Sequence, residues 1–83
     1  MYYTYVLQSL KDNKLYIGHT RDLKKRVEMH NKGQVTSTKQ RSPFKLLYYE
    51  ACNVLDDAIK REHQFKTGFG RNYLKKRLDD LKI

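Results

Sequence analysis

The residues from Leu15 to His30 combine the side chains that a phosphate site needs with a spacing that can bring them together. Tyr16 stands in a short apolar stretch that predicts a strand, and Gly18 follows it. Glycine lets the backbone turn sharply or come close to a ligand at little steric cost. Arg26 and His30 are four residues apart in the helix expected next, so their side chains lie one above the other. Tyrosine, arginine and histidine grouped in this way predict a site for a phosphate.

The helix that carries Arg26 and His30 is expected from about Leu23 to Asn31. Thr20 or Asp22 can cap its first turn by accepting hydrogen bonds from free backbone N–H groups. Gly33 follows the expected end of the helix, where glycine commonly terminates helices.

Three segments have the composition of strands: Tyr2–Leu10, Leu15–His19 and Phe44–Cys52. They are rich in tyrosine, valine and threonine or are continuously apolar. The first two predict a hairpin, and a turn centred between Asp12 and Asn13 would put Tyr3, Tyr5, Tyr16 and Gly18 on one face. The third is apolar on both faces, which predicts a strand covered on both sides.

A second helix is expected from roughly Val54 to Lys66, capped by Asn53 or Asp56. Its apolar stripe comprises Leu55, Ala58, Ile59 and Phe65. Glu62 falls inside this stripe rather than opposite it. A carboxylate on a buried face is costly unless it is paired or holds a metal. Glu62 is therefore a candidate metal ligand, and an ion pair with Lys66 four residues later is the simpler alternative.

Two further segments complete the chain. Residues 34–43 show no periodicity and predict an exposed loop, whose hydroxyls, with Lys39 and Arg41, are of the kind that contact sugar-phosphate. A polar loop can equally have no function. Gly68 and Gly70 are expected to break the chain before a last helix over residues 71–82, with Leu74, Leu78 and Leu81 inward.

The charge of the chain indicates its partner. The 83 residues include 18 Lys and Arg against 9 Asp and Glu, a net charge of +9 with a pI near 9.8. A surplus of this size on one small domain attracts polyanions, nucleic acid first. A membrane partner is not expected, because no long apolar run and no basic helix with large apolar anchors is present.

The cysteine and histidine content restricts the metal and the compartment. Cys52 is the single cysteine, so no internal disulfide can form, and a reducing cytoplasm is the simpler assumption. The N-terminus does not have the pattern of a signal peptide. The three histidines and Cys52 do not have the paired spacing of a structural zinc site.

Taken together, these residues resemble the GIY-YIG nuclease superfamily over nearly the whole chain. Tyr16-Ile17-Gly18 stands as the second motif, and Tyr3-Thr4-Tyr5 occupies the first, keeping its tyrosine but not its glycine and isoleucine. Arg26 matches the catalytic arginine of the family, His30 its frequent histidine, and Glu62 its metal-binding glutamate.

The run HNKG, the strand LLYYE, the pair Arg61-Glu62 and the segment KTGFGR are similar to small stand-alone members related to the N-terminal nuclease domain of the excision-repair C subunit. Two positions depart from that subgroup. His19 follows the second motif where a lysine is more usual, and Asn72 is only a candidate for the late asparagine.

The resemblance implies an α+β fold, a three-stranded antiparallel sheet flanked by about three helices, as a single domain over residues 1–83. It implies metal-dependent phosphodiester hydrolysis with Mg²⁺ or Mn²⁺. Mg²⁺ can be held by one carboxylate, Glu62, together with water and phosphate oxygens. Arg26 would stabilise the charge of the transition state. The general base stays open: Tyr16 supported by Tyr5, whose ordinary pKa of ~10 is too high, or His30.

The expected substrate is DNA rather than RNA, recognised by structure rather than sequence, in repair or recombination. A larger repair assembly could supply the targeting. Lys66 and Arg71 are the remaining candidate contacts to phosphate. The alternative is a binding module on the same fold that holds nucleic acid without cutting it. The oligomeric state does not follow from the sequence.

Overall fold

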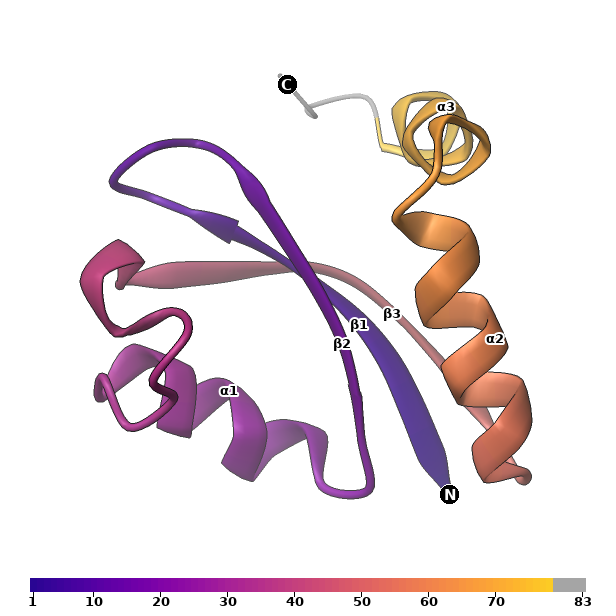
Figure 1. Ribbon diagram of the computed structural model, residues 1–83, viewed down its shortest axis with the longest axis horizontal. Helices are drawn as coiled ribbons and strands as arrows, with labels where there is room; N and C mark the ends of the chain where they lie inside the picture. Colours follow the sequence, from indigo (N-terminus) through magenta and orange to yellow (C-terminus); the bar gives the residue numbers. More distant parts are fainter. Residues whose placement is uncertain (79–83) are drawn as a thin grey trace.

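The strands form one antiparallel sheet, and the helices lie on its two faces (Figure 1). The computed structural model describes residues 1–78. In chain order the elements are β1 (Tyr2–Ser9), β2 (Leu15–Thr20), α1 (Leu23–Asn31), the 3₁₀ turn η1 (Lys39–Arg41), β3 (Phe44–Cys52), α2 (Leu55–Phe65) and α3 (Gly68–Arg77). The predicted fold class is confirmed, with α1 and β3 at the predicted residues.

The central strand is β1, which pairs with β2 on one side and β3 on the other. Tyr5 lies opposite Gly18 in the hairpin, a register two residues away from one centred between Asp12 and Asn13. A shift of two residues leaves each side chain on its face. Tyr5, Tyr16 and Gly18 therefore share one face, as predicted, and β2 is left as an edge strand.

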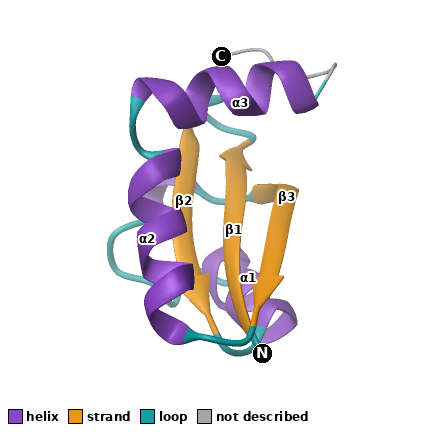
Figure 2. Cartoon of the chain, turned by 90° about the vertical axis from the view of Figure 1, so that its right-hand side faces the viewer, coloured by secondary structure: helices purple, strands orange, loops and turns teal. Residues whose placement is uncertain are grey.

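Successive residues of β1 supply two separate cores. The buried residues are Tyr5, Leu7 and Phe44 on the α1 face, and Val6, Phe65 and Leu74 on the opposite face. Figure 2 shows α2 running along the strands and α3 crossing their ends. No helix among residues 1–78 is long and apolar enough to span a membrane.

The start of the last helix was predicted wrongly. Gly68 and Gly70 do not break the chain but form the first turn of α3, and the Thr67 hydroxyl caps it by accepting from the Gly70 N–H at 3.4 Å. A Cβ at Gly70 would collide with the backbone of Phe65. Glycine is needed here because α3 packs directly on the end of α2. The predicted positions of Leu81 and Lys82 lie outside the described residues.

Three smaller expectations also differ from the structure. β3 is an edge strand with Tyr49 52% exposed, so it is not covered on both sides as predicted. The N-cap of α2 is Val54, and neither Asn53 nor Asp56 provides a side-chain cap. The segment 34–43 is not wholly exposed, since Val35 and Thr38 are buried and a 3₁₀ turn follows them. That burial has a role in the site described next.

Candidate active site

The edge position of β2 lets side chains from both faces of the sheet approach one another. Tyr16 of β2 and Tyr5 of β1 lie on the α1 face with ring centroids 6.4 Å apart. Glu62 comes from α2 on the other face, and its Oε1 contacts the Nδ1 of His19 in β2 at 2.7 Å. Since no further strand of the described chain lies outside β2, these groups can meet around its edge.

Gly18 makes room for the Tyr5 side chain. A Cβ at Gly18 would lie 2.6 Å from the Tyr5 hydroxyl oxygen and 2.8 Å from Cζ. The backbone of Gly18 is part of a regular strand, so the requirement is spatial and not conformational. The sequence suggested a turn or a close approach at this glycine; the close approach occurs, and its partner is Tyr5.

His30 lies at the centre of a buried polar cluster beneath β2. Its side chain has no exposed surface. Nε2 is 2.9 Å from the Tyr5 hydroxyl and Nδ1 is 2.7 Å from the Thr38 hydroxyl. Burial, with a smaller contribution from the positive charge of Arg26, lowers the pKa of His30 from 6.5 to about 4. The imidazole is therefore neutral at neutral pH.

One arrangement of protons satisfies the whole cluster. The Thr38 hydroxyl donates to the Val35 carbonyl at 3.4 Å, which leaves its oxygen to accept from Nδ1–H of His30. A neutral imidazole that is protonated on Nδ1 has a free lone pair on Nε2. Nε2 then accepts from the Tyr5 hydroxyl, so the chain of hydrogen bonds runs from Tyr5 inward to Val35.

Arg26 lies over this cluster from α1. Burial raises the pKa of the Tyr5 hydroxyl, and a hydrogen bond with the Arg26 guanidinium opposes that rise. Arg26 also lines a surface hollow together with His19. The guanidinium is therefore placed between the tyrosine cluster and solvent, where it can meet an anion.

Glu62 is largely buried and is paired on both oxygens. Its side chain is 15% exposed, and Lys66 Nζ lies 2.8 Å from Oε2 while His19 occupies Oε1. Burial raises the pKa of this carboxyl, but the hydrogen bonds from Lys66 and His19 outweigh it, and the pKa is lowered overall. Glu62 is thus ionised, and the expected ion pair with Lys66 is present.

The donor set around Glu62 fits only certain metals. Among residues 1–78 no group of three or more His, Cys, Asp or Glu side chains could hold an ion. A single carboxylate suits Mg²⁺, which keeps several waters and takes other oxygens from substrate phosphate. It does not suit structural zinc, which needs four protein ligands.

Arg41 is already engaged within the protein. Its Nε donates to Asp12 Oδ2 at 3.1 Å and its Nη2 donates to the Lys14 carbonyl at 3.1 Å. These bonds join η1 to the β1–β2 turn. The predicted contact of Arg41 with nucleic acid would have to share the guanidinium with this structural role.

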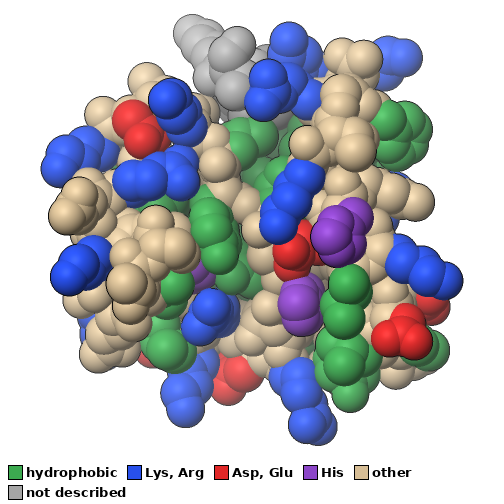
Figure 3. Space-filling model, viewed as in Figure 1, with side chains coloured by type: hydrophobic (Ala, Val, Ile, Leu, Met, Phe, Trp, Pro, Cys, Tyr) green, Lys and Arg blue, Asp and Glu red, His purple; other side chains and the backbone are tan. Residues whose placement is uncertain are grey.

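The other cations predicted to bind nucleic acid are accessible. Lys39 and Arg71 are exposed, and Lys66 is 51% exposed although it pairs with Glu62. Figure 3 shows Lys and Arg side chains spread over this view of the molecule, with one acidic group near its middle. Such a surface suits a polyanion.

Comparison with known proteins identifies the family. The GIY-YIG catalytic domain matches residues 1–78. The chain belongs to the GIY-YIG family. The resemblance seen in the motifs is thereby confirmed, and GIY-YIG domains are nucleases.

Relatives of this GIY-YIG chain are small UPF0213 proteins. One from Pediococcus pentosaceus is 48% identical over 66 residues, which cover 78% of this chain and 68% of that protein. One from Staphylococcus saprophyticus is 40% identical over 67 residues, 80% of each protein. The solution NMR structure of a UPF0213 protein from Bacillus halodurans superimposes with a TM-score of 0.55 and 29% identity, covering 92% of this chain and 84% of that one. These names state no reaction.

Two residues of the site were not singled out from the sequence. Thr38 was grouped with the hydroxyls of an exposed loop, yet it is 1% exposed and hydrogen-bonded to His30. His19 was noted only as a departure from the motif, yet it contacts Glu62. The alternation of β2 places His19 on the α2 face and could have indicated this contact.

Proposed function

We propose that this protein is a metal-dependent endonuclease that hydrolyses phosphodiester bonds in DNA. The observation that carries the proposal is that Tyr16, Arg26 and Glu62 all act on Tyr5, whose hydroxyl is bonded to the buried His30. Each of the three has a distinct use in the reaction. An unpaired carboxylate repels phosphate, so Glu62 has a clearer use as a metal ligand than in phosphate binding alone.

The accessibility of the side chains supports Tyr16 as the general base. Tyr5 and His30 are buried, and both ring nitrogens of His30 have partners. Tyr16 is half-buried and lines a surface groove. A water near a bound phosphate can therefore reach the Tyr16 oxygen but not the imidazole, and we assign Tyr5 and His30 to positioning and proton sharing.

The reaction is an attack of water on phosphorus. As the new P–O bond forms, the P–O bond to the leaving sugar oxygen breaks, and the Tyr16 oxygen, as phenolate, takes the proton from water. Lys66 lines the same groove as Tyr16 and places a positive charge in it. Arg26 stabilises the extra negative charge on the phosphoryl oxygens through its planar fork of donors.

Glu62 would hold the divalent cation, Mg²⁺ or Mn²⁺. Bound there, such an ion supplies charge neutralisation at the phosphate and the leaving oxygen. Lys66 and His19, which now pair with Glu62, would move to other contacts, and both are exposed enough to do so.

The surface cations support recognition by structure rather than sequence, because phosphate contacts carry no sequence information. We propose a role in DNA repair or recombination in the cytoplasm, inside or outside a larger assembly. The free thiol of Cys52 is consistent with a reducing compartment.

The ion pairs of Glu62 favour one alternative, a binding module that does not cut. A carboxylate neutralised by Lys66 and His19 no longer repels phosphate strongly, so the site could bind nucleic acid without metal.

Cleavage and binding assays on the same substrates separate the two functions. The panel contains single-stranded, nicked and branched DNA and RNA with Mg²⁺ or Mn²⁺, for wild type, Glu62→Ala and Arg26→Ala. We expect wild type to cut and both variants to bind without cutting. A wild type that binds in both metals and never cuts would overturn the nuclease and leave the binding module.

A further inference from the structure

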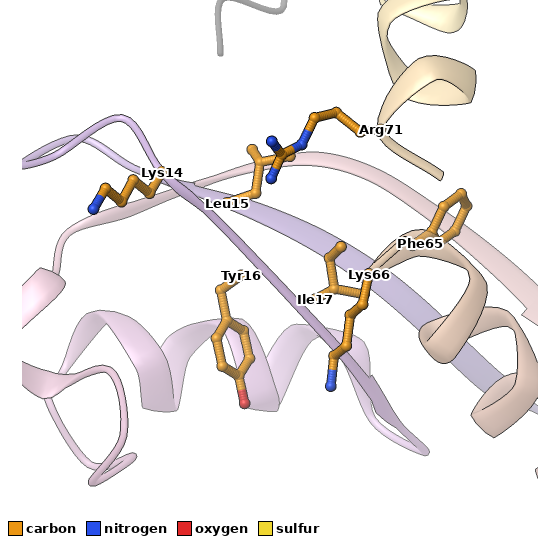
Figure 4. A pocket seen from close by; sticks show the side chains of 7 residues that line it. All are labelled: Lys14, Leu15, Tyr16, Ile17, Phe65, Lys66 and Arg71. Carbon is orange, nitrogen blue, oxygen red and sulfur yellow. The ribbon is translucent and has the colours of Figure 1, made fainter. Parts of the chain in front are cut away.

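A groove of about 590 Å³ runs beside the edge of β2, between that strand and the start of α3 (Figure 4). It is lined by Lys14, Leu15, Tyr16, Ile17, Phe65, Lys66 and Arg71. This volume lies in the range of pockets that hold small organic ligands, so it can hold a piece of a nucleic acid strand.

The lining of the groove combines an apolar floor with positive charge. Leu15, Ile17 and Phe65 supply the apolar part, and no acidic residue takes part in the lining. Lys14 and Arg71 are exposed, and neither side chain has a hydrogen-bond or ion-pair partner among residues 1–78. Two unneutralised cations over an apolar floor are complementary to a ligand with anionic and flat apolar parts.

The groove leads directly into the candidate active site. Tyr16 and Lys66 belong to both. In Figure 4 their polar ends point toward the lower part of the view, and Arg71 lies near Leu15 in the upper part. A second hollow, of about 420 Å³, contains His19, Arg21 and Arg26 on the far side of the site. Positive charge thus flanks the site in both directions along β2.

We propose that the groove binds unpaired nucleotides of the substrate strand immediately beside the bond that is cut. Bases that rest on Leu15 and Ile17 must be free of a pairing partner, since a paired base presents only its edge. Phosphates would meet Lys14 and Arg71. The inference rests on the proposed function only in naming this strand as the one cut.

The preferred substrate is then a duplex with a single-stranded tail or flap rather than a continuous duplex. A continuous duplex could contact Lys14 and Arg71 through phosphates alone. It could not place bases on the apolar floor, so it would gain nothing from the groove beyond charge.

The test is a binding experiment with an uncut substrate. The double variant Lys14→Ala/Arg71→Ala is compared with a matched double variant, Lys45→Ala/Arg77→Ala, which removes the same charge from exposed positions outside the groove. Both are made in a Glu62→Gln background. The probes are a blunt DNA hairpin and the same hairpin with an unpaired tail on the 5′ or the 3′ strand, followed by fluorescence anisotropy over a range of salt.

The unsubstituted background should prefer one tailed hairpin over the blunt one by about tenfold. The groove variant should lose that preference, and its salt dependence on the tailed hairpin should flatten by ~0.7 for each lost phosphate contact. The Lys45→Ala/Arg77→Ala variant should keep the preference. Two results would overturn the proposal that the groove binds unpaired nucleotides. One is an equal loss of affinity in both variants on all probes, and the other is a background protein that shows no preference for a tail.

The two proposals fail in different ways. Loss of cleavage in every metal with the tail preference intact overturns the nuclease and not the groove. If the wild type cuts DNA but the groove substitutions leave the tail preference unchanged, the groove proposal is overturned and the nuclease proposal is not.

Discussion

Two glutamates, Glu50 and Glu62, lie between the sheet and α2 and differ in what holds them. Glu50 receives two bonds from one guanidinium, Arg61 Nε to Oε1 and Nη2 to Oε2, each at 2.9 Å. The Tyr48 hydroxyl adds a third at 2.8 Å. Glu62 receives one bond from each of two separate side chains, His19 and Lys66.

The partners differ in freedom as well as in number. Arg61 lies over the rings of Phe65 and Tyr73, with its Cζ 4.5 Å and 4.9 Å from their centroids. Stacking on both rings fixes the planar group before it binds. The partners of Glu62 are held by single contacts and are more exposed.

Exposure alone would rank these glutamates in the wrong order for metal access. Glu62 is 15% exposed and Glu50 is 29% exposed. A carboxylate becomes available to a cation when its partners can leave, and those of Glu62 can. We infer that the replaceability of the partners, more than burial, distinguishes a candidate metal ligand from a structural carboxylate.

The sharpest test removes the negative charge of each glutamate in turn. Glu62→Gln should reduce cleavage about a thousandfold, because it removes a ligand whose ion contributes several kcal/mol, and should leave the melting temperature nearly unchanged. Glu50→Gln should lower the free energy of unfolding by ~1–2 kcal/mol and the melting temperature by ~5–15 °C. At temperatures well below that melting temperature the variant should retain cleavage. A phosphodiesterase assay and thermal denaturation give the two readouts. The opposite pattern would invert the comparison.

A pH titration of stability tests whether the cluster around His30 is fixed like that of Glu50. The pKa of His30 is about 4 in the folded chain against 6.5 as its ordinary value. Between pH 4 and pH 6.5, His30 is therefore protonated in the unfolded chain but neutral in the folded chain. The free energy of unfolding should have its full value above pH 6.5 and fall by up to ~3 kcal/mol toward pH 4.

The substitution His30→Asn should flatten this dependence in urea unfolding measured at several pH values. His63→Asn, which changes an exposed histidine, is the control and should retain it. If the two variants titrate alike, the cluster is open to solvent and His30 returns as a candidate base.

The smallest effects are expected for the partners of Glu62. His19→Ala and Lys66→Ala should each change the free energy of unfolding by less than ~0.5 kcal/mol and shift the melting temperature by less than ~4 °C. The reason is that each lost partner is itself exposed and Glu62 keeps the other one. Calorimetry or circular dichroism can resolve this. A loss as large as that of Glu50→Gln would mean that the pairs are structural and that Glu62 is not free to take a metal.

Local patterns were enough to predict much of the fold and to single out most residues of the candidate site. The cap at Asp22, confirmed by its bond from Lys25 N–H, and the helical spacing after it fixed α1. Glu62 was identified as an anomaly because it falls within the apolar stripe of α2. These signals depend on residues within a turn or two of one another, which sequence spacing describes directly.

What sequence could not supply were contacts that depend on how the elements pack against one another. Gly70 looked like a breaker because the backbone of Phe65, which excludes any Cβ there, is visible only in three dimensions. Thr38 looked exposed because its neighbours are polar, and only the fold brings it against His30. Arg61 of α2 pairs with Glu50 of β3, and the spacing of these residues in the sequence does not indicate this pair.

Gly18 and Tyr5 have a consequence for how sequences of this fold can vary. Because the tyrosine ring occupies the space of a Cβ at Gly18, neither position can change without regard to the other. A chain with a smaller residue at position 5 gains freedom at position 18, and a chain that keeps the tyrosine gives up that freedom. Two positions thirteen residues apart, paired across β1 and β2, should therefore vary as one unit over evolutionary time.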